Sequence, residues 1–225
     1  MLSEALGGLL PSAVGVAISP VPIIAVILML GTPKAKSNGP AFALGWVIGL
    51  VAVSVIVLAV AGGADDPDST AATGVNWFQV AVGILFLAMA AGQWRKRPTP
   101  GEQPEMPTWM AMIDNFDAIK SLCLGALLSG LNPKNLALTA AGAASIAQAG
   151  LSSGESGIAV GVFVVIASTT VVGPVAFYLV APDAATRPLT TTKGFMSDHN
   201  AVIMMVVLLI LGAKILGQGL GALGS

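Results

Sequence analysis

Long apolar runs alternate with short polar segments along the chain. A transmembrane helix needs about 20 predominantly apolar residues, and six of the runs reach that length. The first run follows MLSEAL, which holds an acid and no base. It is also too long for the apolar part of a signal peptide, so we expect a retained helix. The pattern predicts an all-α integral membrane protein whose six helices cover roughly residues 6–31, 40–62, 76–94, 121–148, 157–181 and 200–219.

Composition supports this interpretation and argues against several functions. Of the 225 residues, 55% are hydrophobic and 9% are charged, and the mean hydropathy is +0.87. A soluble domain carries about 25% charged residues, so this much apolar surface requires lipid as its solvent. The net charge of −1 argues against a nucleic-acid partner. Cys123 is the single cysteine, which leaves no disulfide framework, CxxC pair or Cys/His metal cluster, and we expect neither a metal nor a cofactor.

Basic residues are confined to alternate loops. The second predicted loop (GGADDPDSTAATG) and the fourth (AGLSSGES) hold none, whereas the other three hold eight. Cytoplasmic loops carry the excess of lysine and arginine, so we expect a multi-pass protein of the plasma (inner) membrane with both termini extracytoplasmic. The eight residues are Lys34, Lys36, Arg95, Lys96, Arg97, Lys120, Arg187 and Lys193.

An internal repeat relates the two halves of the chain. SPVP at 19–22 matches NPKN at 132–135, and GWVIG at 45–49 matches GIAVG at 157–161. Each half holds three helices, so the second half enters the membrane inverted, an architecture typical of secondary transporters. The GxxxG spacing lets helices two and five approach their neighbours closely, and plain packing is the favoured role of these glycines. The predicted organisation is a three-helix repeat over 1–94, a cytoplasmic linker over 95–120 and a second repeat over 121–225.

The linker is rich in proline at first and then amphipathic. Residues near 109–119 either lie along the cytoplasmic interface or belong to a solvated connection.

The matched proline motifs predict breaks in helices one and four. Proline removes a backbone donor, and a break at membrane depth persists only against protein or a wet cavity. Paired broken helices point to a binding site between the repeats. Ser19 and Asn132 are predicted to cap the half-helices that follow the breaks, whose N-termini attract anions. The candidate substrate-binding residues are Ser19, Pro20, Pro22, Asn132, Pro133, Lys134 and Asn135.

Lys134 is the most informative of these residues, because no Asp or Glu lies in the central part of any predicted helix to pair with it. It has three possible fates: to snorkel to an interface, to bind carbonyls while deprotonated, or to wait in a cavity for an anion. Ionisable residues inside membranes are usually functional, and we expect a substrate or coupling role. Asn135 either lines the same cavity or bonds to helix one.

Other candidates have simpler interpretations. Lys214 can snorkel from the outer end of helix six, and His199 is interfacial rather than a proton relay. Asp117 and Lys120, with Asp114 nearby, form a charged turn that anchors the interface, a gate being the minor alternative. The acids of the second loop are solvated, although they could bind a divalent ion weakly; they are Asp65, Asp66 and Asp68.

Three segments of the chain resemble the lysine-exporter superfamily, and within it the glycolipid-addressing (GAP) or sulfolipid-addressing proteins. The segments are ISPVPIIAVILML, GWVIG and GALLSGLNPKNLAL. The resemblance covers nearly the whole chain, and NPKN is its most specific part. It implies six helices in two repeats and a role in moving acylated glycolipids of the cell envelope toward the surface. Metal-exporting relatives use intramembrane acids, which this chain lacks.

Three functions compete. The leading hypothesis is a transporter, or transport component, that exports an envelope lipid with an anionic head group by alternating access of the repeats. It would act on lipids as substrates, as a homo-oligomer or in a larger export complex. The alternatives are a small-solute, amino-acid-like exporter and an accessory scaffold for a larger lipid pump. An enzyme is not expected, because the single histidine lies at the wrong depth for a hydrolase and no ATP-binding motif is present.

Overall fold

The structure, a computed structural model, describes residues 2–62, 77–95 and 108–220. These residues form helices and no strands, which confirms the all-α prediction. The helices are α1 (Leu2–Ala17), α2 (Pro20–Leu30), α3 (Ala35–Gly62), α4 (Trp77–Arg95), η1 (Thr108–Asn115), α5 (Ala118–Gly130), α6 (Pro133–Gln148), α7 (Ser153–Val180), α8 (Pro182–Asp198) and α9 (Asn200–Leu220). Asp65, Asp66 and Asp68 lie outside the described residues.

Three helical segments are long and apolar enough to cross a membrane: Ala35–Val60, Ser153–Val180 and Asn200–Gly217. The pair Ala5–Ala17 and Pro20–Leu30, bent by 51° at its break, could serve as a fourth span. α4 and α5 are shorter apolar helices. The membrane character of the chain is therefore clear, while the count of six spans stays a prediction.

The predicted breaks are present where the prolines stand. Pro20 is the first residue of α2 and Pro133 the first of α6, the helix position at which proline costs no hydrogen bond. The helices before these prolines end at Ala17 and Gly130. Each of the two apolar runs therefore folds as a pair of helices, α1 with α2 and α5 with α6.

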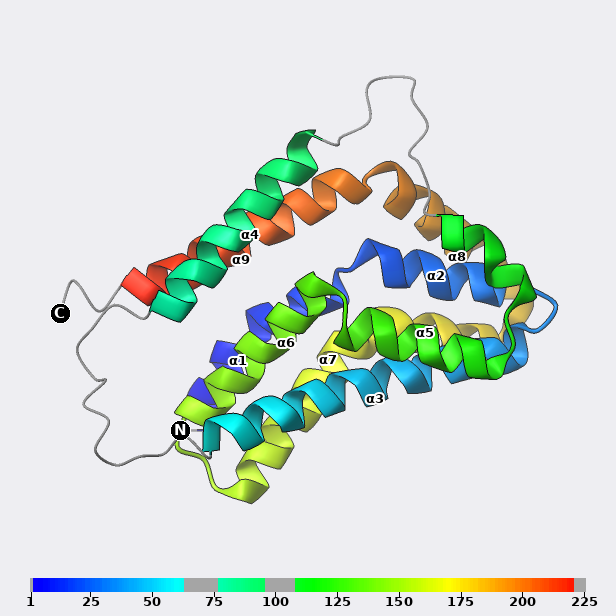
Figure 1. The fold of residues 1–225 in the computed structure, drawn as a ribbon. Helices are drawn as coiled ribbons and strands as arrows, with labels where there is room; N and C mark the ends of the chain where they lie inside the picture. Colours follow the sequence, from blue (N-terminus) through cyan, green and yellow to red (C-terminus); the bar gives the residue numbers. More distant parts are fainter. Residues whose placement is uncertain (1, 63–76, 96–107, 221–225) are drawn as a thin grey trace.

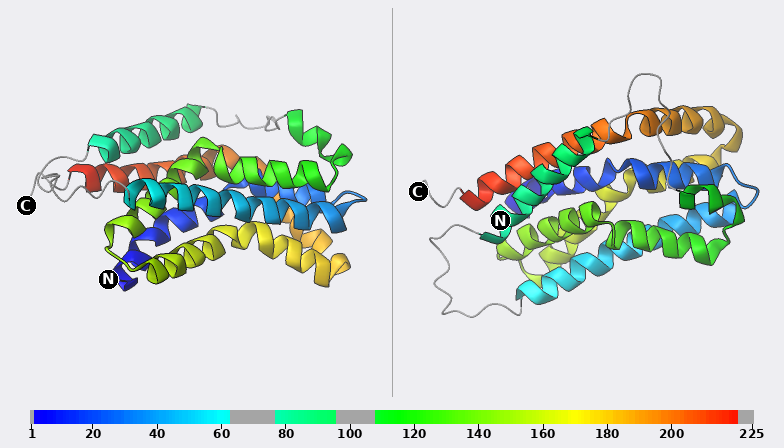
Figure 2. Two further views of the ribbon diagram at one scale, coloured as in Figure 1. Left: turned by 60° about the horizontal axis from the view of Figure 1, so that its bottom comes forward. Right: turned by 45° about the horizontal axis from the view of Figure 1, so that its top comes forward.

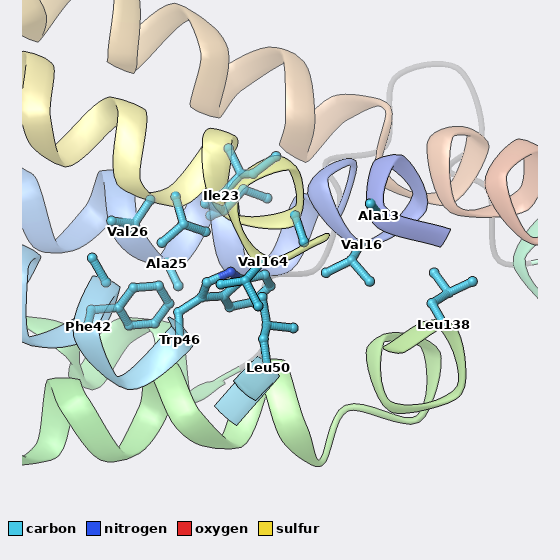
Figure 3. Packing of buried hydrophobic residues seen from close by; sticks show 14 of the residues in the cluster. Ala13, Val16, Ile23, Ala25, Val26, Phe42, Trp46, Leu50, Leu138 and Val164 are labelled. Carbon is cyan, nitrogen blue, oxygen red and sulfur yellow. The ribbon is translucent and has the colours of Figure 1, made fainter. Parts of the chain in front are cut away.

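The helices form a bundle around α2, which is buried along nearly its whole length (Figure 1). α3 packs along α5, while α1 packs against α6 and α7. α4 and α9 lie side by side at the edge of the bundle in all views (Figures 1 and 2). Phe42, Trp46 and Leu50 of α3 point into the core, toward Ala25 of α2 and Val164 of α7 (Figure 3).

Different helix termini lie at the two ends of the bundle. The start of α1, the end of α3, the end of α6 and the start of α7 share one end with the end of α9 (Figure 1). The α2–α3 turn, η1, the start of α5 and the end of α7 lie at the opposite end. We call these the N-terminal end and the far end. Lys34, Lys36 and Lys120 belong to the far end, as the loop charges predict for one common side.

Glycines let α3 and α5 touch through their backbones. A Cβ on Gly45 would collide with the carbonyl of Leu122, and one on Gly125 with the carbonyl of Phe42. A Cβ on Gly49 would collide with atoms of α5 as well. This close approach of the second predicted helix confirms the packing role of GWVIG.

The second GxxxG pair behaves differently. A Cβ on Gly157 or Gly161 would meet no atom within 4 Å, and both residues are exposed. The prediction that these glycines bring helix five close to a neighbour is therefore wrong for the described part of the chain. Identical spacing in the sequence has placed one pair in a helix contact and the other on an open surface.

Two connecting segments are more ordered than a loop. Residues expected to form the fifth loop fold as α8, whose Ala185 and Leu189 are buried while Arg187 stays exposed. α8 packs against α2 and α7. η1 occupies the amphipathic part of the linker and buries Met110 and Ile113. Both segments cover the far end of α2, which favours the interfacial interpretation of residues 109–119.

Candidate functional site

The two helix breaks meet in the core. The Ser19 hydroxyl donates to Asn135 Oδ1 at 2.8 Å and accepts from Lys134 Nζ at 2.7 Å. All three side chains are at most 4% exposed. The predicted pairing of SPVP with NPKN is therefore a physical contact between residues more than 100 positions apart, and we call Ser19, Lys134 and Asn135 the break network.

Lys134 supplies a hydrogen-bond donor where proline lacks one. In an uninterrupted helix the carbonyl of Ile18 would accept from the N–H of residue 22, but Pro22 has none. Lys134 Nζ donates to that carbonyl at 3.0 Å instead. The side chain is 2% exposed, so snorkelling is wrong. The carbonyl bond of the second fate is observed, and both partners of Nζ are neutral oxygens, while the deprotonated state stays a prediction.

Asn135 likewise supplies a hydrogen-bond donor at the second break. A continuous helix would bond the carbonyl of Leu128 to the N–H of Asn132, but that N–H turns to Leu127 O at 3.2 Å. Asn135 Nδ2 donates to Leu128 O at 2.9 Å. Its Oδ1 accepts from the Ser19 hydroxyl, so of the two alternatives for Asn135 the bond to the first membrane helix is the one observed. The Ile18 and Leu128 carbonyls are thus both paired inside protein, as a lipid-surrounded break requires.

The predicted caps are half correct. Asn132 Oδ1 accepts from the backbone N–H of Lys134 at 3.1 Å, which caps α6. Ser19 makes no cap, because its hydroxyl is engaged by the break network. Since Pro20 and Pro22 lack N–H groups and Ile23 bonds to Ser19 O, the start of α2 presents little to an anion. The anion site predicted at this half-helix loses its physical basis.

Among the other motif residues, Asn132 bonds to the network only through the backbone N–H of Lys134. Pro20 and Pro22 are buried in the core, whereas Pro133 is exposed and Asn132 is half-buried. Their part is to shape the backbone. Substrate binding by any of the seven residues stays a prediction, because the structure holds no ligand.

Sequence reasoning missed a fourth contributor, Thr170 of α7. Its Oγ1 donates to the carbonyl of Ala17, the last residue of α1, at 2.6 Å. In an uninterrupted helix that carbonyl would accept from the N–H of Val21. The signal available in the sequence was STT at 168–170, three hydroxyl residues within an apolar run.

Further polar side chains are buried without a partner. The Trp46 indole N–H and the hydroxyls of Ser54, Thr139 and Ser168 have no hydrogen bond within the described structure, and each side chain is at most 4% exposed. An unpaired polar group costs free energy in a dry interior. Helices α3, α6 and α7 therefore carry unpaired polar atoms that water, a ligand or another arrangement of the bundle could satisfy.

The remaining candidates are simpler. Lys214 Nζ lies 3.5 Å from Gly8 O, which joins α9 to α1. His199 is exposed, contacts Phe195 O at 3.0 Å and stacks on the Phe195 ring, an interfacial arrangement. Asp117 is the N-cap of α5 and accepts the backbone N–H of Lys120 at 2.8 Å. That bond, with the charge of Lys120, lowers the pKa of the Asp117 carboxyl.

Two hollows lie away from the break network. One of about 700 Å³ sits at the N-terminal end between α3, the α6–α7 turn and α7, with Val55, Leu151, Ser156 and Gly157 in its wall. The other, of about 260 Å³, sits at the far end between α2, α7 and α8. No residue of the break network lines either hollow. The network is closed in this conformation.

Comparison with known proteins adds a family. The family model described as Sap, sulfolipid-1-addressing protein, matches residues 9–221. No curated protein matches the chain. No solved structure matches it either.

Proposed function

Because the chain belongs to the family of sulfolipid-1-addressing proteins, we propose that it exports an envelope glycolipid, alone or as a component of a larger export complex. The family is named for lipid addressing, and the chain is a helical membrane protein. The observation that carries the proposal is the buried contact between two broken helices with a lysine at its centre. Lys134 is the basic side chain that an anionic head group would meet once the helices around the network part.

The proposal places six spans in the plasma membrane with both termini extracytoplasmic. The α1–α2 pair, α3, α4, the α5–α6 pair, α7 and α9 are the six segments. The basic residues of the far end would face the cytoplasm, where such residues accumulate. The eight-to-none distribution of loop charges is the support for this orientation.

Helix boundaries support an inverted repeat. α1 and α5 end 113 residues apart, at Ala17 and Gly130, and the helices after the breaks also start 113 residues apart, at Pro20 and Pro133. α3 and α7 have 28 residues each and start 118 residues apart, because α6 is five residues longer than α2. With the offset of 118 residues, GWVIG of α3 no longer corresponds to GIAVG of α7.

Packing supports the same correspondence. α1 packs on α7, and α5 packs on α3. Ala17 meets Thr170, while Gly130, the counterpart of Ala17, lies against Val53. The position 118 residues before Thr170 is Ala52, next to Val53. Two helix pairs with the same register in opposite directions are what an inverted repeat and alternating access require.

The test replaces Lys134 with alanine in a strain that lacks the native protein. Surface lipids are profiled by mass spectrometry, protein abundance is checked, and Lys193→Ala is the control for loss of a lysine charge outside the core. The proposal expects one glycolipid class to disappear from the surface in Lys134→Ala and to remain in Lys193→Ala. Unchanged lipids in the deletion strain itself would reject the lipid function and favour small-solute export. Full rescue by Lys134→Ala would leave the lipid function and remove the lysine from it.

A further inference from the structure

The helices that pack most closely cross from one repeat to the other. α3 of the first half touches α5 of the second through backbone at Gly45 and Gly125. The α6 helix, which continues α5, also packs on α3. These contacts leave no room for α3 to slide over α5, so the two three-helix halves are poorly suited to move as rigid units.

Two other groups of helices are better suited to move together. Body A consists of α3, α5 and α6. Body B consists of α1, α2 and α7, since α7 packs against both α1 and α2. The correspondence between repeats exchanges body A with body B, helix for helix.

The two bodies meet differently at the two ends of the bundle. At the N-terminal end α1 lies directly on α6, and we call this contact the seam. At the far end α2 and α5 are not packed on each other, and Phe42 and Trp46 point from α3 toward α2 (Figure 3). Between the ends lies the break network, which joins Ser19 of body B to Lys134 and Asn135 of body A.

Small residues form the part of the seam nearest the start of α1, whereas closer to the breaks Leu138 of α6 packs against Gly15 of α1. A Cβ on Gly8 would lie 3.7 Å from the Ser145 Cβ, and one on Gly142 would lie 3.5 Å from the Ser12 Cβ. Contacts between glycine and serine bury few methylene groups, so separating them exposes little apolar surface. The Thr139 hydroxyl of α6 is fully buried and has no hydrogen-bond partner among the described residues.

We propose that bodies A and B rock about the break network, and that α1 and α6 part along the seam to open the N-terminal end. The inference rests on the proposed transport function and adds the moving parts to it. The network lies at the pivot, where a rocking motion changes distances least. The seam lies at one end, where the motion changes distances most.

Paired cysteines test the proposal in a Cys123→Ser background. Gly8→Cys with Ser145→Cys would lock the seam, because a Cβ on Gly8 would lie 3.7 Å from the Ser145 Cβ, a separation that suits a disulfide, with no other neighbour within 4 Å. Val53→Cys with Gly130→Cys is the control within body A, because a Cβ on Gly130 would lie 3.6 Å from Val53 Cγ2, a position that the sulfur of a cysteine at residue 53 can take. Cells lacking the native protein and expressing each pair are pulsed with labelled acetate. The arrival of labelled glycolipid at the surface is followed before oxidation, after oxidation and after reduction.

The seam disulfide is expected to slow lipid arrival by about tenfold or more, reversed by reductant, because it blocks a gating motion. The disulfide within body A is expected to leave the rate within about twofold. If both disulfides blocked lipid arrival, the two repeats would themselves be the moving units, and the assignment of bodies A and B would be overturned. A complete seam disulfide with an unchanged rate, or a seam pair that never cross-links, would overturn the gate. If Lys134→Ala still removes the lipid in either case, the proposed function survives and only this inference fails.

Discussion

The Ser19 hydroxyl joins the two helix breaks, and Ser19→Ala should destabilise the protein more than a serine loss elsewhere in the bundle. The change removes two buried hydrogen bonds, at 2.7 and 2.8 Å. Lys134 keeps only the Ile18 carbonyl, and Asn135 Oδ1 loses its hydrogen-bond donor. Hydrogen bonds inside membrane proteins contribute roughly 0.6 to 1.7 kcal/mol each, so the expected loss is about 1–3 kcal/mol in the free energy of unfolding.

Ser145→Ala is the matched control for this measurement. Ser145 Oγ donates to Ala141 O within α6 at 3.0 Å, a bond that contributes little because the helix already satisfies that carbonyl. Unfolding of the purified protein in detergent micelles, followed by circular dichroism against denaturant, should show a shift for Ser19→Ala and almost none for Ser145→Ala. Equal shifts would mean that the break network does not hold the breaks together.

A double-mutant cycle isolates the bond between Lys134 and Ser19. Lys134→Met keeps the length of the side chain and removes its donors. If the bond is formed, Ser19→Ala should cost less in the Lys134→Met background, with a coupling of about 0.5–1.5 kcal/mol. Additive effects of the two changes would refute the reasoning that each break is completed by the other.

Three further predictions follow from other contacts. Thr170→Val should lower stability by about 1 kcal/mol, and Thr170→Ser should restore it, since only the hydroxyl bonded to Ala17 O matters. Gly45→Ala should destabilise by about 2 kcal/mol or more and Gly157→Ala should stabilise by about 0.5–1 kcal/mol, both measured by denaturant unfolding, because only the first glycine touches another helix. The Asp117 carboxylate, whose pKa is lowered, should contribute stability that is complete at neutral pH and lost as the pH falls from the ordinary carboxyl pKa through the lowered one. Asp117→Asn should remove this acid-dependent loss from the pH profile of unfolding.

The breaks could be predicted from the sequence because proline acts through its covalent structure. A missing N–H is missing in any fold, so a break at Pro20 and Pro133 needs no knowledge of the neighbours. Where the freed carbonyls find donors is a different matter. Sequence reasoning assigned Ser19 to capping. Its hydroxyl instead bonds to the Lys134 amine and the Asn135 amide, which are 115 residues or more away along the sequence. Thr170 was missed for the same reason, since its partner lies on another helix.

The glycine match failed for a geometric reason. A helix face is fixed by 100° steps, so a wrong offset of a few residues turns a packing face outward. The five extra residues of α6 shift α7 relative to α3, and the letters GxxxG cannot report that shift. α8 was missed because its sequence is polar. Packing of Ala185 and Leu189 decides its structure, and that packing depends on the position of α2.

The proposed repeat does not duplicate the break network. At its 113-residue offset Lys134 corresponds to Val21 and Asn135 to Pro22, so only the second half supplies the lysine of the buried polar centre. If the network is the proposed pivot, its contacts persist while the two bodies rock, and one lysine serves both conformations. Variants of Ser19 should therefore change the free energy of unfolding, whereas a cross-link at the seam should change the rate of lipid arrival with the fold intact. If the seam disulfide instead disrupted folding and Ser19→Ala left stability unchanged, the pivot and the gate would have been assigned to the wrong contacts.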